Sequence, residues 1–296
     1  MGIQNYPATS IVIATLNNRE GLGKVLRGML ELDYPNGYEV IVVDDGSTDG
    51  TGKMLDKEFS RAPKIKIIHL PRSGACRARN AGIRLAKGEI IVNMDHDCIP
   101  AKTWLKRMVE PFANGQVGIV TGYGGFGGTS TAFRREPLER AGGYDEEYFY
   151  YREDTDLAFK IIDLGYEFLQ VDAPYFHDHK IEKPRSFLDA IPYGLKRILW
   201  HKNDALLWKK HPTKVCADFL HVKMGFLVDP FYDFSIATGT WEKKGRLALS
   251  SPRGIVFLEN KSPLHAIAII FFGLLYVIAV KLVRLYGSVK YRKLLL

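Results

Sequence analysis

Two aspartates, Asp95 and Asp97, end the apolar run in the stretch IVNMDHDCIP at residues 91–100. If "GEIIVNM" is a buried strand, its carboxyl end delivers both side chains to nearly the same point, because residues i and i+2 of a strand share a face. Like charges at that distance repel, so a positive group should offset them. A hard divalent cation with oxygen ligands is the leading candidate.

A second acidic pair, Asp44 and Asp45, stands in "VVDDGSTDGT" at residues 42–51. The Gly, Ser and Thr that follow can turn the chain and cap the next helix, so either aspartate alone could be a turn former. The presence of Asp95 and Asp97 after a neighbouring strand favours a functional interpretation of both pairs.

A third acidic pair, Glu153 and Asp154, opens a predicted helix in "REDTDL". The helix dipole and free N–H groups stabilise negative charge there, so the pair could be ordinary first-turn acids. A carboxylate can also act as a general base. In "YFHDHK", residues 175–180, His177 and His179 are candidate ligands, although a lone histidine is more often structural.

The elements that position these residues follow a βαβ pattern. The runs "SIVIAT", "YEVIVV", "KIKIIHL" and "GEIIVNM" alternate with amphipathic segments near residues 20–32, 50–61 and 77–86. This pattern predicts an α/β fold with a mostly parallel sheet covered by helices on both faces. Ligands bind beyond the carboxyl ends of such strands, and three of those ends carry polar groups. After the first strand these groups are Thr15, Asn17 and Glu20.

Beyond residue 115 we expect a mixed edge to the sheet and a helix near 153–164. The segment "GYGGFGG" contains G-x-G-x-x-G at Gly122, Gly124 and Gly127. A dinucleotide-binding fingerprint should open a helix, whereas "TSTAF" after this segment predicts a strand. We therefore do not interpret it as a cofactor loop.

The basic charge lies in the C-terminal part of the chain. Residues 1–179 hold 21 Lys and Arg against 25 Asp and Glu, and residues 180–296 hold 20 against 8, a net charge of +12. Residues 185–210 mix aromatic and basic residues at helical spacing, with Pro192 expected to break or kink the helix. This segment suits a membrane interface or a helix packed on the catalytic domain.

Residues 264–280 form a nearly continuous apolar run, "LHAIAIIFFGLLYVIAV". We favour a membrane span or re-entrant anchor over a buried core helix. Basic residues on both sides leave its orientation open. The apolar run also argues against a nucleic-acid partner. Three widely spaced cysteines are interpreted as reduced thiols. We expect a catalytic domain at 1–183, a basic interfacial region at 184–263 and a membrane segment with a basic tail at 264–296.

Over roughly residues 8–180 the chain resembles the inverting glycosyltransferases of family 2, which have the GT-A fold. The resemblance rests on "ATLNNRE", "VVDDGSTDGT", "ARNAGI", "NMDHDCIP" and "GGYDEEYFYYREDTDLAFKI" in the expected order. It implies that Asp97 and His177 hold Mg²⁺ or Mn²⁺. It makes Asp154 the catalytic base, ahead of Asp156, with Glu153 orienting the acceptor or the loop. The implied nucleotide pocket comprises Thr15, Asn17, Glu20, Asp44, Asp45, Arg79, Asn80 and Asp95, with a structural role equally open for Arg79 and Asn80.

The implied activity is transfer of a sugar from a UDP, GDP or dTDP donor to a lipid-linked saccharide or polysaccharide acceptor. We expect the catalytic domain to lie on the cytoplasmic side of the cell membrane. A polyprenyl-phosphate monosaccharide synthase is a close rival, because a phosphate acceptor weakens the need for a strong base. A sugar-1-phosphate nucleotidyltransferase is a more distant one, because it needs a Gly-rich loop after the first strand, which "TLNNRE" lacks.

Overall fold

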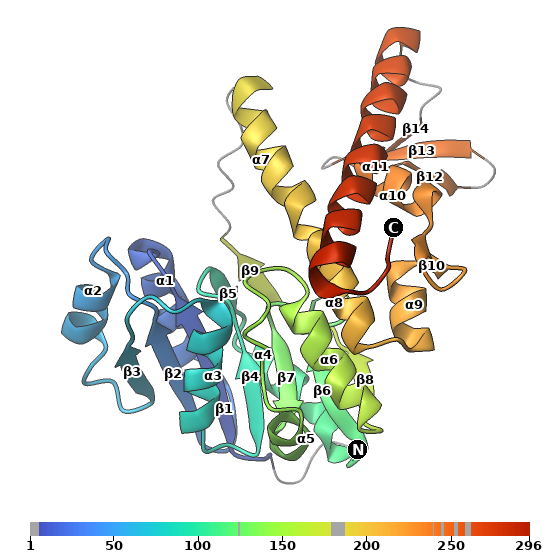
Figure 1. Cartoon of the computed structure of the whole chain (residues 1–296). Coiled ribbons are helices and arrows are strands. Elements are labelled where there is room, and N and C mark those ends of the chain that lie inside the picture. The colour runs from blue at the N-terminus through green and yellow to red at the C-terminus, as the bar shows by residue number, and fades with distance from the viewer. Residues whose placement is uncertain are drawn as a thin grey trace. The chain divides into compact units, whose positions relative to one another are not determined.

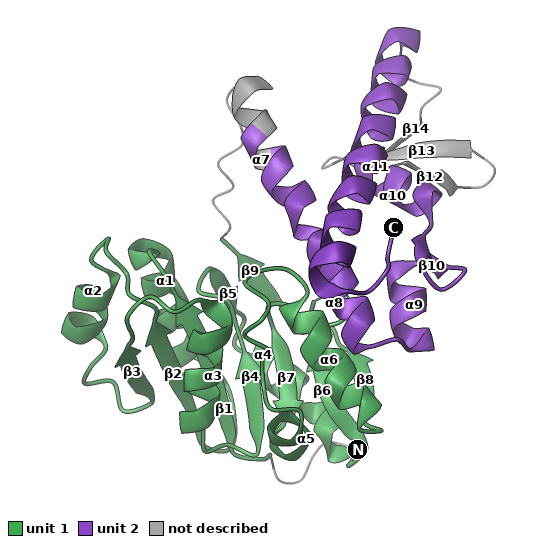
Figure 2. Cartoon of the chain, in the orientation of Figure 1, with its two compact units in different colours: residues 1–182 green, residues 183–296 purple. Residues whose placement is uncertain are grey.

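The computed structural model of the chain describes residues 6–123, 125–178, 187–238, 240–243, 246–251, 254–257 and 262–296. The chain divides into two compact units, residues 1–182 and 183–296 (Figure 2). The candidate residues of the sequence analysis belong to the first unit, and the apolar run belongs to the second.

The first unit is built on a seven-stranded sheet with the order β3-β2-β1-β4-β7-β6-β8 (Figure 1). Only β7 runs antiparallel to its neighbours β4 and β6, so the sheet is mostly parallel with a mixed edge, as expected. The strands are β1 Thr9–Thr15, β2 Tyr38–Asp44, β3 Ile65–His69, β4 Ile90–Asn93, β6 Val117–Thr121, β7 Thr131–Arg134 and β8 Glu167–Gln170.

Two apolar cores lie on the two faces of the sheet because successive side chains of a strand point to opposite faces. Ile11 and Ile13 of β1 pack in one core, with residues of α1, α2 and α4. Val12 packs in the other, with residues of α3, α5 and α6. The helices are α1 Arg19–Leu30, α2 Thr51–Glu58, α3 Ala75–Leu85, α4 Trp104–Val109, α5 Arg135–Arg140 and α6 Glu153–Asp163, with a 3₁₀ turn, η1, at Glu110–Ala113.

Strand register brings the carboxyl ends of three strands into line. Thr15 at the end of β1 pairs with Asp44 of β2, and Asp44 pairs with His69 of β3. The polar groups that follow these strands therefore gather at one edge of the sheet, where ligands of parallel sheets bind. The segment after Gly122 leads into strand β7 and not into a helix, which confirms that it is no dinucleotide fingerprint.

One expectation about Asp95 and Asp97 was wrong. Strand β4 ends at Asn93, so the i, i+2 geometry of a strand does not extend to the two aspartates. The chain instead turns, and a short strand β5 (Cys98–Pro100) pairs antiparallel with β9 (Tyr175–His177). The two carboxylates consequently have separate surroundings: Asp95 lies beside Arg79, and Asp97 lies beside His177.

The second unit consists mainly of helices. Helix α7, Phe187–Trp200, continues through Pro192, so the expected break is absent there; the helix ends at Trp200, and α8, Lys202–Lys210, begins after His201. The remaining elements are α9 Lys214–Leu220, β10 Val222–Lys223, β11 Leu227–Val228, α10 Pro230–Thr238, β12 Thr240–Lys243, β13 Arg246–Ser251, β14 Gly254–Phe257 and α11 Pro263–Tyr291.

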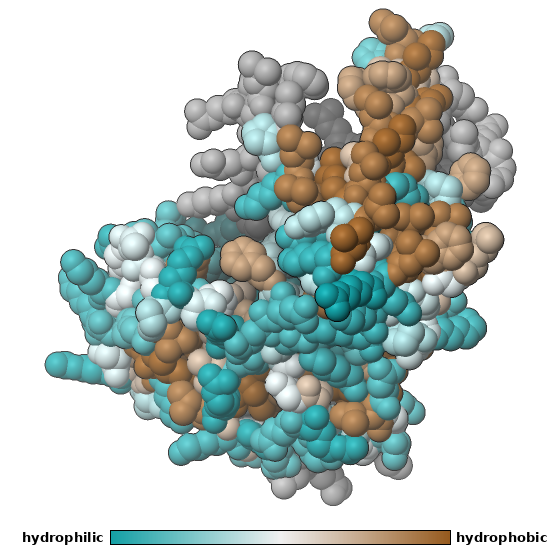
Figure 3. Space-filling view, viewed as in Figure 1, coloured by the Kyte–Doolittle hydropathy of each residue, from teal (hydrophilic) through white to brown (hydrophobic). Residues whose placement is uncertain are grey.

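Helix α11 has two different halves. Its 29 residues are long and apolar enough to cross a bilayer, and only 11% of its most apolar 18-residue stretch is buried. Its apolar side chains form a continuous surface along the helix (Figure 3), which does not fit the buried core helix that the sequence left open. Near its C-terminal end, by contrast, Arg284 is buried against two carboxylates, with Nε 3.0 Å from Asp204 and Nη1 2.6 Å from Asp233.

Close packing of α3 on the sheet supplies a test of this fold. A Cβ at Gly82 would lie 2.5 Å from Val12 Cγ1 and 3.2 Å from Val43 Cγ2, both in the core. We expect Gly82→Ala to lower the free energy of unfolding by about 1–3 kcal/mol, because the core must shift to accept the methyl group. Denaturant unfolding measures this. Gly115→Ala, where the structure leaves open space, is the control, and equal stability of the two variants would contradict the packing described.

Candidate active site

One guanidinium, that of Arg79 on α3, lies among three carboxylates from separate parts of the chain. Its Nη2 is 3.3 Å from Asp95, and its Nη1 is 3.6 Å from Glu153 and 3.7 Å from Asp154. Burial alone would lower the pKa of Arg79, but these carboxylates, Asp154 foremost, raise it well above its usual value. The positive charge that offsets Asp95 is therefore a side chain of the protein.

Asp154 is held from several directions in the first turn of α6. Its Oδ1 lies 3.7 Å from Nη1 of Arg79. A Cβ at Gly127 would lie 2.7 Å from Asp154 Cβ, so only glycine lets that loop approach so closely. Burial raises the pKa of Asp154, and Arg79 opposes the rise. A carboxylate in such surroundings is a stronger base than one in water.

Glu153, the neighbour of Asp154, is 5% exposed, and its Oε2 has no hydrogen-bond partner among the described residues. Burial, reinforced by the charge of Asp154, raises the pKa of Glu153 to about 7. Two adjacent acids with one shared cation hold a proton more readily than isolated acids. The pair is thus electrostatically costly when both groups are ionised.

The chain enters this acidic turn through two left-handed residues, Tyr151 with φ 72° and Arg152 with φ 83°. Such conformations are unfavourable for residues other than glycine and concentrate at functional sites. Asp156, the alternative base, lies in a different environment: it accepts from Tyr148 at 3.2 Å and pairs with Lys160 at 2.8 Å. These contacts give Asp156 a structural role.

A second cluster contains the expected metal ligands. The β5–β9 pairing sets His177 opposite Cys98, and His177 Nε2 is 3.3 Å from Asp97 Oδ2. Ligand atoms of Asp97, Cys98 and His177 all lie within 4.8 Å of one another. Burial raises the pKa of Cys98 to about 12, so its thiol stays protonated and does not suit a hard cation. The oxygen and nitrogen donors of Asp97 and His177 fit Mn²⁺ or Mg²⁺. His179 lies outside the described residues.

Residues expected in the nucleotide pocket lie around the same sheet edge but make different contacts. Asp45 accepts from the N–H groups of Ser73 and Gly74 at 2.7 and 2.9 Å. Asp44 turns the other way: its Oδ1 accepts from Ser47 N–H and its Oδ2 is 3.0 Å from His69 Nδ1. The two neighbouring aspartates thus brace two different loops, and only Asp45 faces the loop that leads into α3.

The loop after β1 is tied to both acidic motifs. Thr15 Oγ1 is 3.0 Å from His96 Nδ1, and Asn17 Oδ1 accepts from Thr48 N–H at 2.8 Å. Glu20 is largely exposed, with Lys24 at 3.6 Å. Asn80 points elsewhere, because its amide pairs with both the N–H and the C=O of Tyr144 at 2.9 and 2.8 Å. Asn80 therefore braces the loop before α6, which is the structural role that the sequence left open for it.

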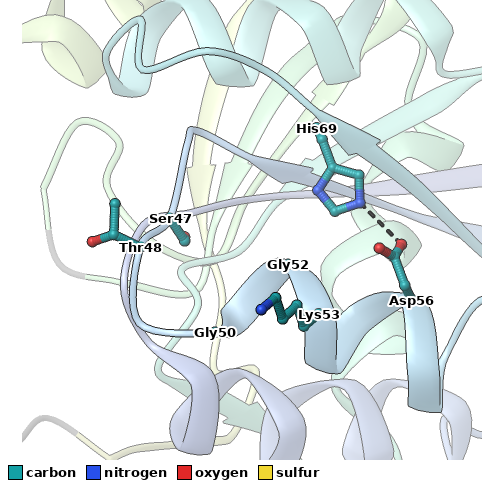
Figure 4. Close-up of a pocket in the computed structure, with 7 residues that line it drawn as sticks. All are labelled: Ser47, Thr48, Gly50, Gly52, Lys53, Asp56 and His69. Atoms are coloured by element: carbon teal, nitrogen blue, oxygen red, sulfur yellow. Dashed lines mark hydrogen bonds and ion pairs between the residues drawn. The ribbon is translucent and has the colours of Figure 1, made fainter.

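A separate hollow of about 320 Å³ lies behind the "GSTDGT" loop (Figure 4). His69 and Asp56 face each other across its rim, with His69 Nε2 3.0 Å from Asp56 Oδ1. Its lining residues are Ser47, Thr48, Gly50, Gly52, Lys53, Asp56 and His69. None of the carboxylates around Arg79 lines it, so it is distinct from the candidate active site.

Comparison with known proteins identifies the family. A model of glycosyl transferase family 2 matches residues 10–167, which include Arg79, Asp95, Asp97, Glu153 and Asp154 but not His177. The chain belongs to this family. Family membership confirms the resemblance of the five motifs and sets aside the nucleotidyltransferase alternative.

Individual relatives match parts of the chain. Glycosyltransferase AglE of Haloferax volcanii is 38% identical over 119 residues, 39% of this chain and 39% of that protein. A beta-monoglucosyldiacylglycerol synthase of a Nostoc species is 29% identical over 196 residues, 53% of this chain and 42% of that protein. The matches thus span about two fifths of these curated relatives.

A solved structure covers most of the chain. The mannosyltransferase PcManGT from Pyrobaculum calidifontis, in complex with GDP-Man and Mn²⁺, superposes with a TM-score of 0.66 over 96% of this chain and 89% of its own, at 22% identity. At this identity the likeness concerns the fold, and it confirms the expected GT-A class.

Sequence reasoning gave no role to two residues that the structure places in the candidate site. The Arg79 guanidinium lies 5.2 Å from the ring centroid of Tyr144, and the hydroxyl of Tyr144 contacts the Asn93 amide. Tyr144 belongs to the "GGYDE" part of the last family motif, but nothing in the sequence around it indicates a chemical role for its side chain. A tyrosine in a turn is ordinary, and only the fold brings its hydroxyl to the Asn93 amide and its ring beside Arg79.

The raised pKa of Glu153 predicts a pH-dependent cost to stability. Because the folded protein binds this proton more tightly than the unfolded chain, the wild type loses stability as pH rises from about 4.5 towards 7. Gln cannot ionise, so we expect Glu153→Gln to be more stable than wild type at pH 8 by about 1–3 kcal/mol, with no advantage near pH 4.5. Thermal unfolding across this range measures the difference.

Glu136→Gln is the matched control, because hydrogen bonding from Tyr166 lowers the pKa of Glu136. That variant should gain nothing at pH 8. An advantage of Glu153→Gln that does not change with pH would contradict the raised pKa.

Proposed function

We propose that this chain is a metal-dependent, inverting glycosyltransferase that moves a sugar from a nucleoside-diphosphate donor to a lipid-linked acceptor at a membrane. The observation that carries the proposal is the Asp154 carboxylate, which is partly buried at the start of α6 with its Oδ1 3.7 Å from Nη1 of Arg79. Its position beyond the carboxyl edge of the sheet, together with Asp97 and His177, matches what a family 2 transferase requires.

The proposed reaction is a single displacement. An acceptor hydroxyl gives its proton to Asp154 while its oxygen forms a bond to the anomeric carbon of the donor sugar. The bond from that carbon to the diphosphate oxygen breaks, and the nucleoside diphosphate leaves with the bonding electrons. Attack opposite the leaving group inverts the anomeric configuration. Burial of Asp154, which raises its pKa, makes it a better proton acceptor than a solvated carboxylate.

Asp97 and His177 would hold the divalent cation, which supplies a Lewis acid that neutralises charge on the diphosphate. A bound Mn²⁺ in PcManGT supports this assignment. Asp45, in its loop of N–H donors, is proposed to turn to the nucleobase, and Asp95 to the ribose. Both are assigned through the family resemblance and lie on the same sheet edge as Asp97.

The lipid-linked acceptor is inferred from the second unit. Its net positive charge suits an anionic lipid surface, to which each nearby Lys or Arg contributes about 1 kcal/mol. The exposed apolar surface of α11 suits the bilayer interior. A glycolipid synthase among the relatives supports the same substrate class. In this proposal the catalytic unit lies on the cytoplasmic side of the membrane.

The decisive experiment measures release of nucleoside diphosphate from UDP-, GDP- and dTDP-sugars with Mn²⁺ or Mg²⁺ and a membrane lipid extract. Loss of either the base or the metal carboxylate should abolish turnover, so we expect Asp154→Asn and Asp97→Asn each to lose at least about 100-fold. Asp156→Asn is the control for folding of α6. Full activity of Asp154→Asn would contradict the role of Asp154 and favour a phosphate acceptor, as in polyprenyl-phosphate monosaccharide synthases.

A second experiment tests membrane binding. Phe271 and Phe272 of α11 are each more than half exposed. Replacing both with Ser removes two large apolar groups, so we expect binding of the full chain to phosphatidylcholine–phosphatidylglycerol vesicles to weaken about tenfold or more. Co-sedimentation measures it. Leu85→Ser, at an exposed site of the first unit, is the control, and unchanged binding of the double variant would rule out insertion of this surface.

A further inference from the structure

The two proposed metal ligands are carried by a ribbon that is separate from the main sheet. Strands β5 and β9 form a two-stranded sheet of their own, and each strand has three residues (Figure 1). Asp97 directly precedes β5, and His177 ends β9. An isolated two-stranded ribbon is only marginally stable, so contacts with neighbouring elements must fix it in place. The separation of the two ligand side chains therefore depends on those contacts.

Asp178, the residue after His177, links both ligand segments to helix α1. Its N–H donates to the backbone carbonyl of Asp97 at 2.8 Å. Its carboxylate contacts a different element, because Oδ2 accepts from Lys24 Nζ on α1 at 3.0 Å. The end of β9 is thus bonded to the Asp97 backbone on one side and to α1 on the other.

Helix α1 holds the other strand of the ribbon as well. Gly28, one turn after Lys24, packs closely on β5: a Cβ at Gly28 would lie 3.2 Å from Ile99 Cγ2 and 3.4 Å from Pro100 Cδ. The glycine contact fixes β5, and the lysine contact fixes β9 through Asp178. Lys24 belongs to neither apolar core, so it can be replaced without opening the core of the first unit.

We propose that Lys24 is a positioning residue for the metal site: through Asp178 it keeps His177 at the distance from Asp97 at which both side chains can bind one divalent cation. The inference rests on the proposed role of Asp97 and His177 as metal ligands, whose Oδ2 and Nε2 atoms lie 3.3 Å apart. Lys24 itself cannot be a ligand, because an ammonium group has donors and no acceptor.

The charge of Lys24 makes the proposal testable by the sign of the effect. A positive charge repels a cation, so if Lys24 acted through its charge alone, removing it would strengthen Mn²⁺ binding. If Lys24 positions His177, removing it weakens Mn²⁺ binding instead. Exposed ion pairs contribute modestly, so we expect Lys24→Met to weaken Mn²⁺ binding about two- to fivefold. Lys24→Arg keeps a cation for Asp178 and should bind Mn²⁺ like the wild type.

The experiment measures the Kd of Mn²⁺ alone for the full chain, from the loss of the free-ion signal in electron paramagnetic resonance. Asp97→Asn shows which part of the binding belongs to the proposed site. Lys66→Met is the matched control: Lys66 Nζ lies 2.5 Å from Glu39, and its side chain is 47% exposed against 42% for Lys24. In an Asp178→Asn background, Lys24→Met should cause no further weakening, because the partner of Lys24 is already lost.

Thermal unfolding establishes that the variants are folded before their Kd values are compared. Unchanged or tighter Mn²⁺ binding by Lys24→Met, an equal weakening in Lys66→Met, or the same weakening in the Asp178→Asn background would overturn the inference and leave the proposed function intact. If wild type shows no Mn²⁺ binding that depends on Asp97, the proposed metal dependence fails, and this inference fails with it.

Discussion

The interaction on which the candidate site depends is the burial of one guanidinium among three carboxylates. Arg79 comes from α3, Asp95 from the turn after β4, and Glu153 and Asp154 from the start of α6. Removing a charge from water is costly unless opposite charges replace the solvent, so this arrangement persists only while all three segments stay in place. Packing of α3 and α6 in the same core, against one face of the sheet, is what keeps them there. The electrostatics of the site therefore depend directly on the packing of the fold.

Periodicity was sufficient to predict the parallel sheet, its helices and the edge at which the acidic motifs meet. These features depend on local patterns of apolar residues, which the sequence displays directly. The surroundings of Asp95 and Asp97 were not predictable in this way, because the strand stops at Asn93 and the turn that follows has no periodic signature. Pairing of Asp97 with His177 depends on two three-residue strands far apart in the chain, and such short strands carry almost no sequence signal.

The assignment of roles within each acidic pair also needed three dimensions. Asp44 and Asp45 are adjacent, yet one contacts His69 and the other Ser73. Asp154 and Asp156 share a helix, yet Lys160 neutralises only the latter. The residue type alone cannot show which of two nearby aspartates has which role. The family motifs point to whole segments, and the contacts in the structure show which of their side chains hold those segments together.

Ion pairs near its C-terminal end hold the apolar helix α11 to its neighbouring helices. Arg284 joins α11 to Asp204 of α8 and Asp233 of α10, and Lys281 adds a further contact to Asp233 at 3.2 Å. In a bilayer these ion pairs would limit how deeply α11 can insert. Deeper insertion would move two carboxylates and two cationic side chains into the hydrocarbon core. The extent of insertion would then be set by the protein and not by the thickness of the host membrane, so that lipid composition changes how strongly the chain binds but not how deeply.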